Sequence, residues 1–230
     1  MKKLPSYTVH ISNNVAELLE DPRPVVALNV MGFWLLTCSF FKPKDFVFWA
    51  DGVFGVIGAF VSGVTIAKKP GRDLLSELMS CIKMVDRQNL RVLILGADAD
   101  YPIMRSCLAG RLQVVSLDHY RDLSQVLSSE LPSVDSADLV LIGIASPKQE
   151  ALAARVFAAK KVKIFCLGGA FGMFEKQEST CPRWISLCGL EWLFRMHSEP
   201  KRRVKRLAST LPGALVGFLT VLVRHSIKRL

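Results

Sequence analysis

A short apolar run that leads directly into a helix start places the strongest constraint on this chain. It lies at residues 139–150, which read LVLIGIASPKQE. Four apolar residues run into Gly143, and a short run bounded by glycine predicts a fully buried strand. Ser146 suits the N-cap, Pro147 suits the first helical position, and Gln149 stands three residues after the cap. The segment therefore predicts a strand, a tight loop and a helix.

The same alternation of strand and helix signals recurs along the chain. We expect further strands at residues 46–52, 91–96, 112–117 and 163–167, and helices near residues 12–20, 101–110, 124–131 and 148–160, with another that opens within residues 68–74 and runs to about residue 88. Strands and helices alternating at this spacing predict a mostly parallel sheet that is covered by helices on both faces. At 230 residues the chain suits one domain of ordinary size with a substantial core.

The start of the helix predicted at residue 148 is suited to an anion. Free N–H groups and aligned peptide dipoles at a helix N-terminus favour negative charge. Lys148 adds a cation there, and Gln149 adds an amide. A phosphate-bearing ligand would fit this position, although many such turns bind nothing and only complete a helix. These residues alone leave both interpretations open.

An excess of cations indicates an anionic partner. Lys and Arg number 30 against 20 Asp and Glu, which gives a formal charge of +10. Nucleic acid, a phosphorylated sugar and an acidic membrane surface all match this charge. The mean hydropathy of +0.31 is high for a nucleic-acid-binding protein and is common in proteins that rest on a bilayer. Because no nucleic-acid-binding motif is present either, we expect no nucleic-acid partner.

The spacing of cysteines and histidines predicts neither a disulfide framework nor a metal site. The six cysteines form no C-x-x-C pair, and the four histidines form no H-x-x-x-H pattern. We predict reduced, mostly buried thiols in a cytosolic compartment and no structural metal. The basic N-terminus has no apolar segment behind it, so we also expect no secretory signal.

Two uncharged stretches leave alternatives open. Residues 25–41 are 17 residues without a charge, which is the lower limit for a membrane span. Asn29 and Gly32 interrupt the stretch, and a membrane span, a buried core segment and an interfacial segment are all compatible with it. Residues 52–67 are also uncharged, and they would either line a lipid groove or pack in the core.

Asp51 follows an aromatic and β-branched run (FVFWA) that predicts a buried strand. Open α/β folds place reactive groups in the crevice beyond the carboxyl ends of such strands. A carboxylate there can remove the proton of a hydroxyl nucleophile as a general base. An Asp before Gly is also common in ordinary turns, so the residue alone leaves both roles open.

The composition changes after Glu199, and we predict a separate appendage over residues 196–230 following a domain over residues 1–195. A basic cluster at 201–206 precedes 13 uncharged residues at 211–223. As a helix these 13 residues would span about 20 Å, short of the roughly 30 Å hydrocarbon core. We expect an interfacial helix on anionic headgroups, or a terminal helix that packs on the core.

Two motifs resemble one enzyme family. Residues 143–150 (GIASPKQE) resemble the G-x-x-x-P-K-Q-E signature of the WecG/TagA/CpsF glycosyltransferases, also called glycosyltransferase family 26. Residues 189–195 (GLEWLFR), with the Glu-Pro and arginines of residues 199–206, resemble the family's G-L-E-W-L-[YF]-R…E-P-x-R ending. The similarity covers roughly residues 29–206, and the motifs are specific when both occur in this order.

The resemblance implies roles for individual residues. Asp51 matches the Asp of the family's A-D-G motif and would be the general base. Asn29 would face the site, and Arg72, in a segment similar to R-x-x-G-x-D-L, would contact a phosphate. The other substrate-binding positions that the resemblance implies are Ser146, Lys148, Gln149, Glu150, Gly168, Gly169, Arg195, Arg202 and Arg206.

We therefore expect a Rossmann-like inverting glycosyltransferase, peripheral on the cytoplasmic face of the cell membrane. It would transfer N-acetylmannosamine, its uronic acid or glucose from a UDP-sugar to a polyprenyl-diphosphate-linked acceptor in cell-surface polysaccharide synthesis. The loop with Gln149 would position the donor. Tail arginines would neutralise the UDP leaving group, so that no metal and no other cofactor is needed.

Two departures from the family pattern support an alternative. Gly172 stands where the family has Asp, and Thr180-Cys181 stands where it has Arg-Ala. The alternative is a catalytically inactive protein that binds a nucleotide-sugar or a lipid phosphate. Turnover of a UDP-sugar would discriminate between the two.

Overall fold

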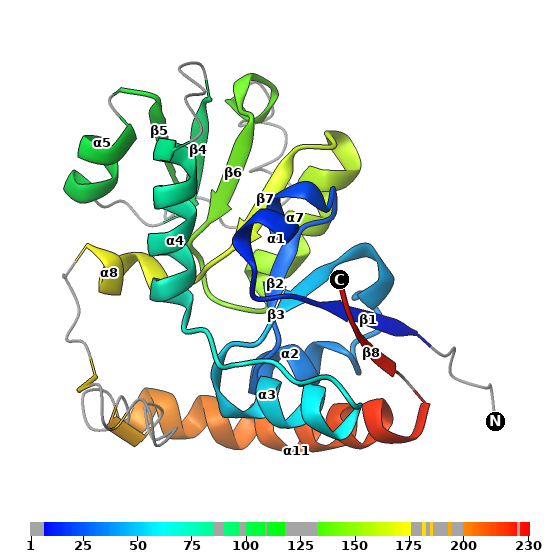
Figure 1. Ribbon diagram of the computed structural model, residues 1–230. Coiled ribbons are helices and arrows are strands. Elements are labelled where there is room, and N and C mark those ends of the chain that lie inside the picture. Colours follow the sequence, from blue (N-terminus) through cyan, green and yellow to red (C-terminus); the bar gives the residue numbers. More distant parts are fainter. Residues whose placement is uncertain are drawn as a thin grey trace.

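One parallel sheet runs through the whole molecule (Figure 1). The computed structural model describes residues 7–84, 90–96, 100–108, 110–117, 133–175, 181–182, 185, 193–194, 200–224 and 226–230. The strands are β1 (Thr8–Ile11), β2 (Val25–Ala27), β3 (Val47–Trp49), β4 (Val92–Gly96), β5 (Leu112–Ser116), β6 (Leu139–Ile142), β7 (Lys163–Cys166) and β8 (Ser226–Arg229). Their order is β5-β4-β6-β7-β2-β3-β1-β8, and each neighbouring pair is parallel.

Helices cover both faces of this sheet. The helices are α1 (Val15–Glu20), α2 (Val30–Leu35), α3 (Gly52–Val61), α4 (Gly71–Met84), α5 (Pro102–Leu108), α7 (Lys148–Ala159), α8 (Ala170–Phe174) and α11 (Pro200–Arg224), with a short 3-10 helix η1 at Pro43–Asp45. Residues from α1, α4, α5 and α8 share one core with the sheet, and residues from α2, α3, α7 and α11 share the other. The predicted α/β architecture is confirmed.

Strand β4 illustrates why the sheet divides the core in two. Its side chains alternate between the two faces, so Leu93 and Leu95 join one core while Val92 and Ile94 join the other. Because both faces are covered, every residue of β4 is buried. This double burial explains why the strand is a continuous apolar run in the sequence.

Most of residues 25–36 belong to the protein core, whereas Thr37, Ser39 and Phe40 are exposed. Residues 25–36 include β2 and α2, and Val25, Leu28 and Phe33 are almost completely buried. Asn29 caps α2 because its Oδ1 accepts from the backbone N–H groups of Met31 (3.0 Å) and Gly32 (3.1 Å). Among the residues that the structure describes, no helix is both long and apolar enough to span a bilayer.

Some sequence expectations need correction or extension. The first strand, β1, was not predicted: Thr8 and His10 do alternate with the buried Val9 and Ile11, but the pattern is only four residues long. Residues 52–61 form α3, for which the sequence analysis assigned no secondary structure. The helix expected over residues 124–131 lies outside the described part of the chain.

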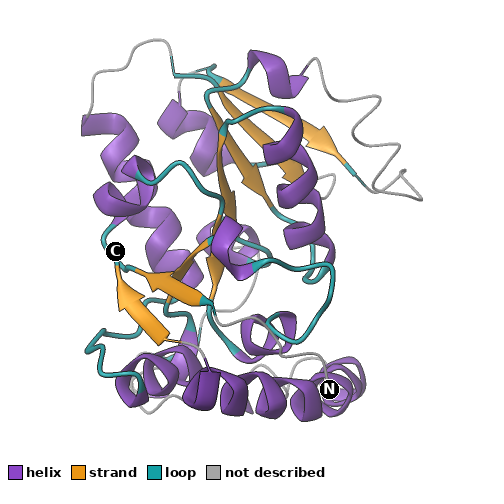
Figure 2. Cartoon of the chain, turned by 90° about the vertical axis from the view of Figure 1, so that its right-hand side faces the viewer, coloured by secondary structure: helices purple, strands orange, loops and turns teal. Residues whose placement is uncertain are grey.

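The C-terminal segment packs on the sheet domain. Figure 2 shows α11 lying across one end of the molecule, and this helix contacts chiefly α2. Phe218 of α11 meets Phe33 of α2 edge to face, with ring centroids 5.3 Å apart. Beyond α11, β8 pairs with β1 and buries Ile227. Residues 200–224 and 226–230 therefore pack on the rest of the molecule, and the boundary at residue 195 stays a prediction.

Glu175 caps a helix that is about 70 residues earlier in the sequence. Its buried carboxylate accepts from the backbone N–H groups of Ile103 (2.8 Å) and Met104 (2.9 Å) at the start of α5. Replacing it with Gln leaves one acceptor oxygen for two donors, so Glu175→Gln is expected to lower the free energy of unfolding by about 1–2 kcal/mol. Urea unfolding measures this loss. The exposed Glu20→Gln is the control, and an equal effect of both changes would contradict the cap.

Candidate functional site

The residues predicted for the site follow neighbouring strands. In the sheet order, β6, β7, β2 and β3 lie side by side, and because they are parallel their carboxyl ends share one edge. Ser146 follows β6, Gly168 follows β7, Asn29 follows β2 and Asp51 follows β3. The structure therefore brings four separate sequence segments to the edge where open α/β sheets bind ligands.

Asn29 and Asp51 contact each other directly. Asn29 Nδ2 donates a hydrogen bond of 2.9 Å to Asp51 Oδ2, while Asn29 Oδ1 caps α2. Asp51 occupies the N-cap position of α3, but its side chain makes no capping bond there. Because both ends of the Asn29 amide are engaged, the amide holds the half-buried Asp51 carboxylate in a defined orientation.

Asn13 supports this pair, and the sequence analysis missed it. Its Oδ1 accepts from the backbone N–H of Ala50 (2.9 Å), and its Nδ2 donates to the backbone carbonyl of Ala67. The bond fixes the backbone immediately before Asp51. Nothing in the sequence around Asn13 could have identified this role, because its partners lie 37 and 54 residues away.

Ser146, Gln149 and Glu150 form a buried network of side chains. The Ser146 hydroxyl donates to Glu150 Oε1 at 2.5 Å and accepts from Gln149 Nε2 at 2.7 Å. Gln149 Nε2 also donates to Glu150 Oε1 at 2.9 Å. Gln149 is 5% exposed and Glu150 is 2% exposed. Their polar groups therefore order the loop through bonds to one another. The same groups are also candidates to contact a ligand.

The predicted N-cap role of Ser146 is wrong. Helix α7 begins at Lys148, and Pro147 takes the N-cap position without a side-chain bond. A turn closed by the Lys148 N–H and the Ala145 carbonyl (3.1 Å) holds residues 146 and 147 outside the helix. The Ser146 hydroxyl therefore bonds to side chains of the first turn in place of backbone N–H groups.

Gln149 points toward the turn after β7. Its Oε1 lies 3.6 Å from where a Cβ on Gly168 would stand, and it has no hydrogen-bond partner among the described residues. Gly168 has a φ of +53°, which favours glycine, and a Cβ on the exposed Gly169 would meet open space. A buried amide oxygen beside an open glycine turn is suited to accept from a ligand.

Cys166 closes the base of this loop. Its Sγ lies 3.8 Å from the Gln149 backbone carbonyl. Complete burial raises the pKa of the Cys166 thiol well above its ordinary value, and the nearby Glu150 carboxylate raises it further. The thiol therefore stays protonated and packs as a small apolar group. All five described cysteines are free thiols, and Cys166 and Cys181 are buried.

The remaining predicted residues differ in how close they lie to this edge of the sheet. Arg72 lies in the first turn of α4, where its Nε contacts Asp73 Oδ1 at 3.3 Å. The preceding Gly71 packs close to Ala170 after β7, so Arg72 is near the same edge. Lys148 is exposed. Arg195 lies outside the described part of the chain, as do the side chains of Arg202 and Arg206, whose backbone belongs to α11.

Trp49 contributes a second unsatisfied polar atom near this edge. Its indole Nε1 is buried and has no hydrogen-bond partner among the described residues. The same ring packs close to Gly71, where α4 begins. The sequence marked Trp49 only as part of an apolar strand.

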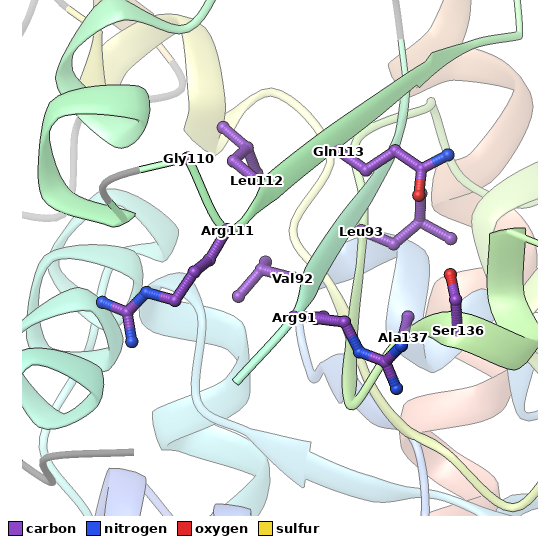
Figure 3. Close-up of a pocket in the computed structure, with 9 residues that line it drawn as sticks. All are labelled: Arg91, Val92, Leu93, Gly110, Arg111, Leu112, Gln113, Ser136 and Ala137. Carbon is purple, nitrogen blue, oxygen red and sulfur yellow. The ribbon is translucent and has the colours of Figure 1, made fainter. Parts of the chain in front are cut away.

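A cavity of about 180 Å³ lies elsewhere. Figure 3 shows that it is lined by residues around the start of β4 and β5, including Arg91, Arg111 and Gln113. These positions belong to the amino ends of the strands, so the cavity is at the edge opposite Asp51. The Arg91 guanidinium already faces Asp138, at 3.6 Å. None of the predicted site residues lines the cavity.

The Ser146 network gives a stability prediction. Ser146→Ala removes the hydroxyl that joins Gln149 and Glu150, so two buried groups lose a partner, and the free energy of unfolding should fall by about 1–3 kcal/mol. Chemical denaturation measures the change. Ser80→Ala on the exposed side of α4 removes a hydroxyl that bonds only its own helix, and it should change stability by no more than about 0.5 kcal/mol. Equal effects would show that the network adds nothing.

The chain was also compared with families of known proteins. A family model described as "Glycosyl transferase WecG/TagA/CpsF family" matches residues 13–228. The match includes every predicted site residue and nearly the whole chain. No curated protein matches the chain. In the described part of the chain, no group of three or more His, Cys, Asp or Glu side chains could hold a metal ion.

Proposed function

Because this chain belongs to the WecG/TagA/CpsF glycosyltransferase family, we propose that it transfers a sugar from a UDP-sugar to a polyprenyl-diphosphate-linked acceptor. Family membership itself makes the chain a glycosyltransferase of cell-surface polysaccharide synthesis. The donor, the acceptor and the stereochemistry are the proposal. The observation that carries it is the Asn29–Asp51 pair at the carboxyl edge of the sheet.

The proposed reaction is a single displacement with inversion. The acceptor oxygen attacks the anomeric carbon and forms the new glycosidic bond, while the bond from that carbon to UDP breaks. Asp51 takes the hydroxyl proton, and the electron pair of the broken bond leaves with UDP. The Asn29 amide supports this role because it orients the carboxylate without neutralising it.

The donor is proposed to bind beside β6 and β7. Gln149 Oε1 can accept from a hydroxyl or N–H of the donor, and the Gly168–Gly169 turn lets its backbone approach closely. Arg72 at the start of α4 is a candidate phosphate contact. Neighbouring strands are about 4.8 Å apart, so the ends of β6 and β3 are separated by about 14 Å. An extended nucleotide-sugar is long enough to reach from one to the other.

Arginines of the C-terminal segment are proposed to stabilise the leaving group. A guanidinium forms paired, charge-assisted hydrogen bonds with a diphosphate, which allows transfer without a metal ion. Arg195, Arg202 and Arg206 are the candidates from the family motif. The same basic segment supports peripheral binding to an anionic membrane surface, where a polyprenyl-linked acceptor is located.

The test is UDP release from a panel of UDP-sugars in the presence of a short-chain polyprenyl-diphosphate-linked acceptor. We expect acceptor-dependent release from one donor, in the presence of a chelator as well as in its absence. Donor binding without release from any sugar would contradict the proposal. That result would favour an inactive nucleotide-sugar-binding protein, for which the missing Asp at Gly172 would be the reason.

A further inference from the structure

Helix α3 is apolar on the side that faces away from the protein. Gly55, Gly58 and Ala59 are buried against the core. The opposite side exposes large apolar residues, and Phe60 is 71% exposed. These residues are Val53, Phe54, Ile57, Phe60 and Val61. A helix that is apolar all round is normally covered on all sides, and the described residues leave this side uncovered.

Helix α11 has the same property in its C-terminal half. Ala214, Gly217 and Val221 face α2 and the core. The outward side exposes a second set of large apolar residues, of which Val223 is 78% exposed. The set is Leu215, Val216, Leu219, Leu222 and Val223. Residues 207–223 contain no charge, although they form the surface of the molecule.

The two helices lie side by side. They contact each other in the structure, and Figures 1 and 2 both show them together at the same end of the molecule. We call the ten exposed residues of the two sets the α3–α11 face. Single exposed apolar residues are normal on a protein surface, whereas a contiguous group of them marks an interaction site.

Charge identifies the partner. Residues 200–230 carry eight Lys and Arg and no Asp or Glu. Residues 52–72 contain Lys68, Lys69 and Arg72 and no acidic residue, with Asp51 and Asp73 standing immediately at the two ends of this range. Apolar side chains flanked by cations, without acids, complement the acyl boundary and phosphate headgroups of an anionic bilayer. A protein partner would also cover apolar residues, but it would not require eight cations and no acid over residues 200–230.

We propose that α3 is a second membrane-binding element, which inserts into an anionic lipid bilayer together with α11. Both helices would lie in the plane of the interface, with the α3–α11 face toward the acyl chains. The buried sides of both helices face the protein, and the exposed apolar sides of these two contacting helices face away from it.

The position of α3 connects membrane binding to the reaction. Asp51 immediately precedes α3, and Phe54 of the α3–α11 face follows three residues later. One helical turn rises about 5.4 Å, so the inserted side of α3 would hold Asp51 close to the headgroups. A hydroxyl linked to a lipid through a diphosphate would be presented at this level. This step rests on the proposed function, whereas lipid binding by α3 does not.

The first experiment is sedimentation of the full chain with vesicles of phosphatidylglycerol and phosphatidylcholine, beside vesicles of phosphatidylcholine alone. Wild type should bind the anionic vesicles more tightly. Phe60→Asp on α3 and Leu219→Asp on α11 should each weaken binding at least about tenfold, because each exchanges buried apolar area for a charge. Ser80→Asp on the exposed side of α4 adds the same charge far from the face and should bind like wild type.

Each outcome bears on the inference. Tenfold weaker binding of Phe60→Asp supports it, whereas wild-type binding of Phe60→Asp, with loss in Leu219→Asp, would overturn the role of α3. If wild type without vesicles is a dimer that Phe60→Asp converts to a monomer, while vesicle binding is unchanged, the face is an interface between copies and the inference is wrong. Both substituted residues are exposed, and circular dichroism checks that the variants fold.

A second readout separates this inference from the proposed function. UDP release is compared between an acceptor embedded in vesicles and a short-chain acceptor in solution. The ratio of the two rates should fall at least about tenfold in Phe60→Asp and stay at the wild-type value in Ser80→Asp. If no acceptor supports release, the proposed function fails, while the vesicle measurements still decide whether α3 binds lipid.

Discussion

Asp51→Asn is expected to lower the rate constant for sugar transfer by about 10²- to 10⁴-fold, with little change in KM for either substrate. A general base contributes a factor of this size, and an amide cannot take up the acceptor proton. The Asn side chain still offers an oxygen to Asn29 Nδ2, so the hydrogen bond of 2.9 Å and the local structure should remain. A loss in kcat at unchanged KM indicates an interaction made only in the transition state.

Asp45→Asn is the matched control for this measurement. Asp45 is an exposed carboxylate just before β3, at the opposite end of the strand from Asp51. It undergoes the same chemical change, and the variant should transfer sugar at the wild-type rate. Transfer by Asp51→Asn at more than a tenth of the wild-type rate would show that another group, or water, accepts the proton. The proposed mechanism would then be wrong.

Gly217→Val is expected to destabilise the protein more than any other single change described above. A Cβ on Gly217 would lie 1.9 Å from the backbone oxygen of Phe33 in α2, and a backbone atom cannot rotate away. One turn earlier, a Cβ on Gly213 would lie 2.3 Å from the Trp34 ring. Helix α11 would have to move off α2, and overpacking of this kind costs about 3 kcal/mol. We expect the Tm to fall by roughly 6–12 °C.

Ala208→Val provides the comparison, because Ala208 is exposed on the same helix and also becomes β-branched. Its cost should be limited to helix propensity, at about 0.5 kcal/mol. Thermal unfolding followed by circular dichroism measures both variants. A Tm of Gly217→Val equal to that of Ala208→Val would mean that α11 is held loosely on α2. The buried Ala214 and Val221 argue against that result.

The packing of α11 also determines how membrane binding should be tested. Ending the chain near residue 198 would remove α11 and β8, and with them the buried residues Val221 and Ile227. The cut would leave Phe33 of α2 and the edge of β1 without their cover. Loss of vesicle binding by such a fragment could follow from unfolding. Substitutions on the exposed side of α11 avoid this ambiguity.

Local signals were sufficient for most of the architecture. Strands such as β4 and β6 are buried on both faces, and they therefore appear in the sequence as short, continuous apolar runs. The same local reasoning placed Asp51 at a strand end. It failed for β1, whose alternating pattern is only four residues long, and for β8, a short basic segment that is held by its pairing with β1.

The sequence by itself thus determined the α/β class, the family and the place of Asp51 at the end of a strand, because these depend on nearest neighbours and on motifs. Only the tertiary structure decided the strand order, and with it the contact between Asn29 and Asp51, which are 22 residues apart. It also decided that Ser146 bonds to side chains and that one side of α3 stays exposed. Such outcomes depend on which elements meet across the sheet, and no local pattern encodes those distances.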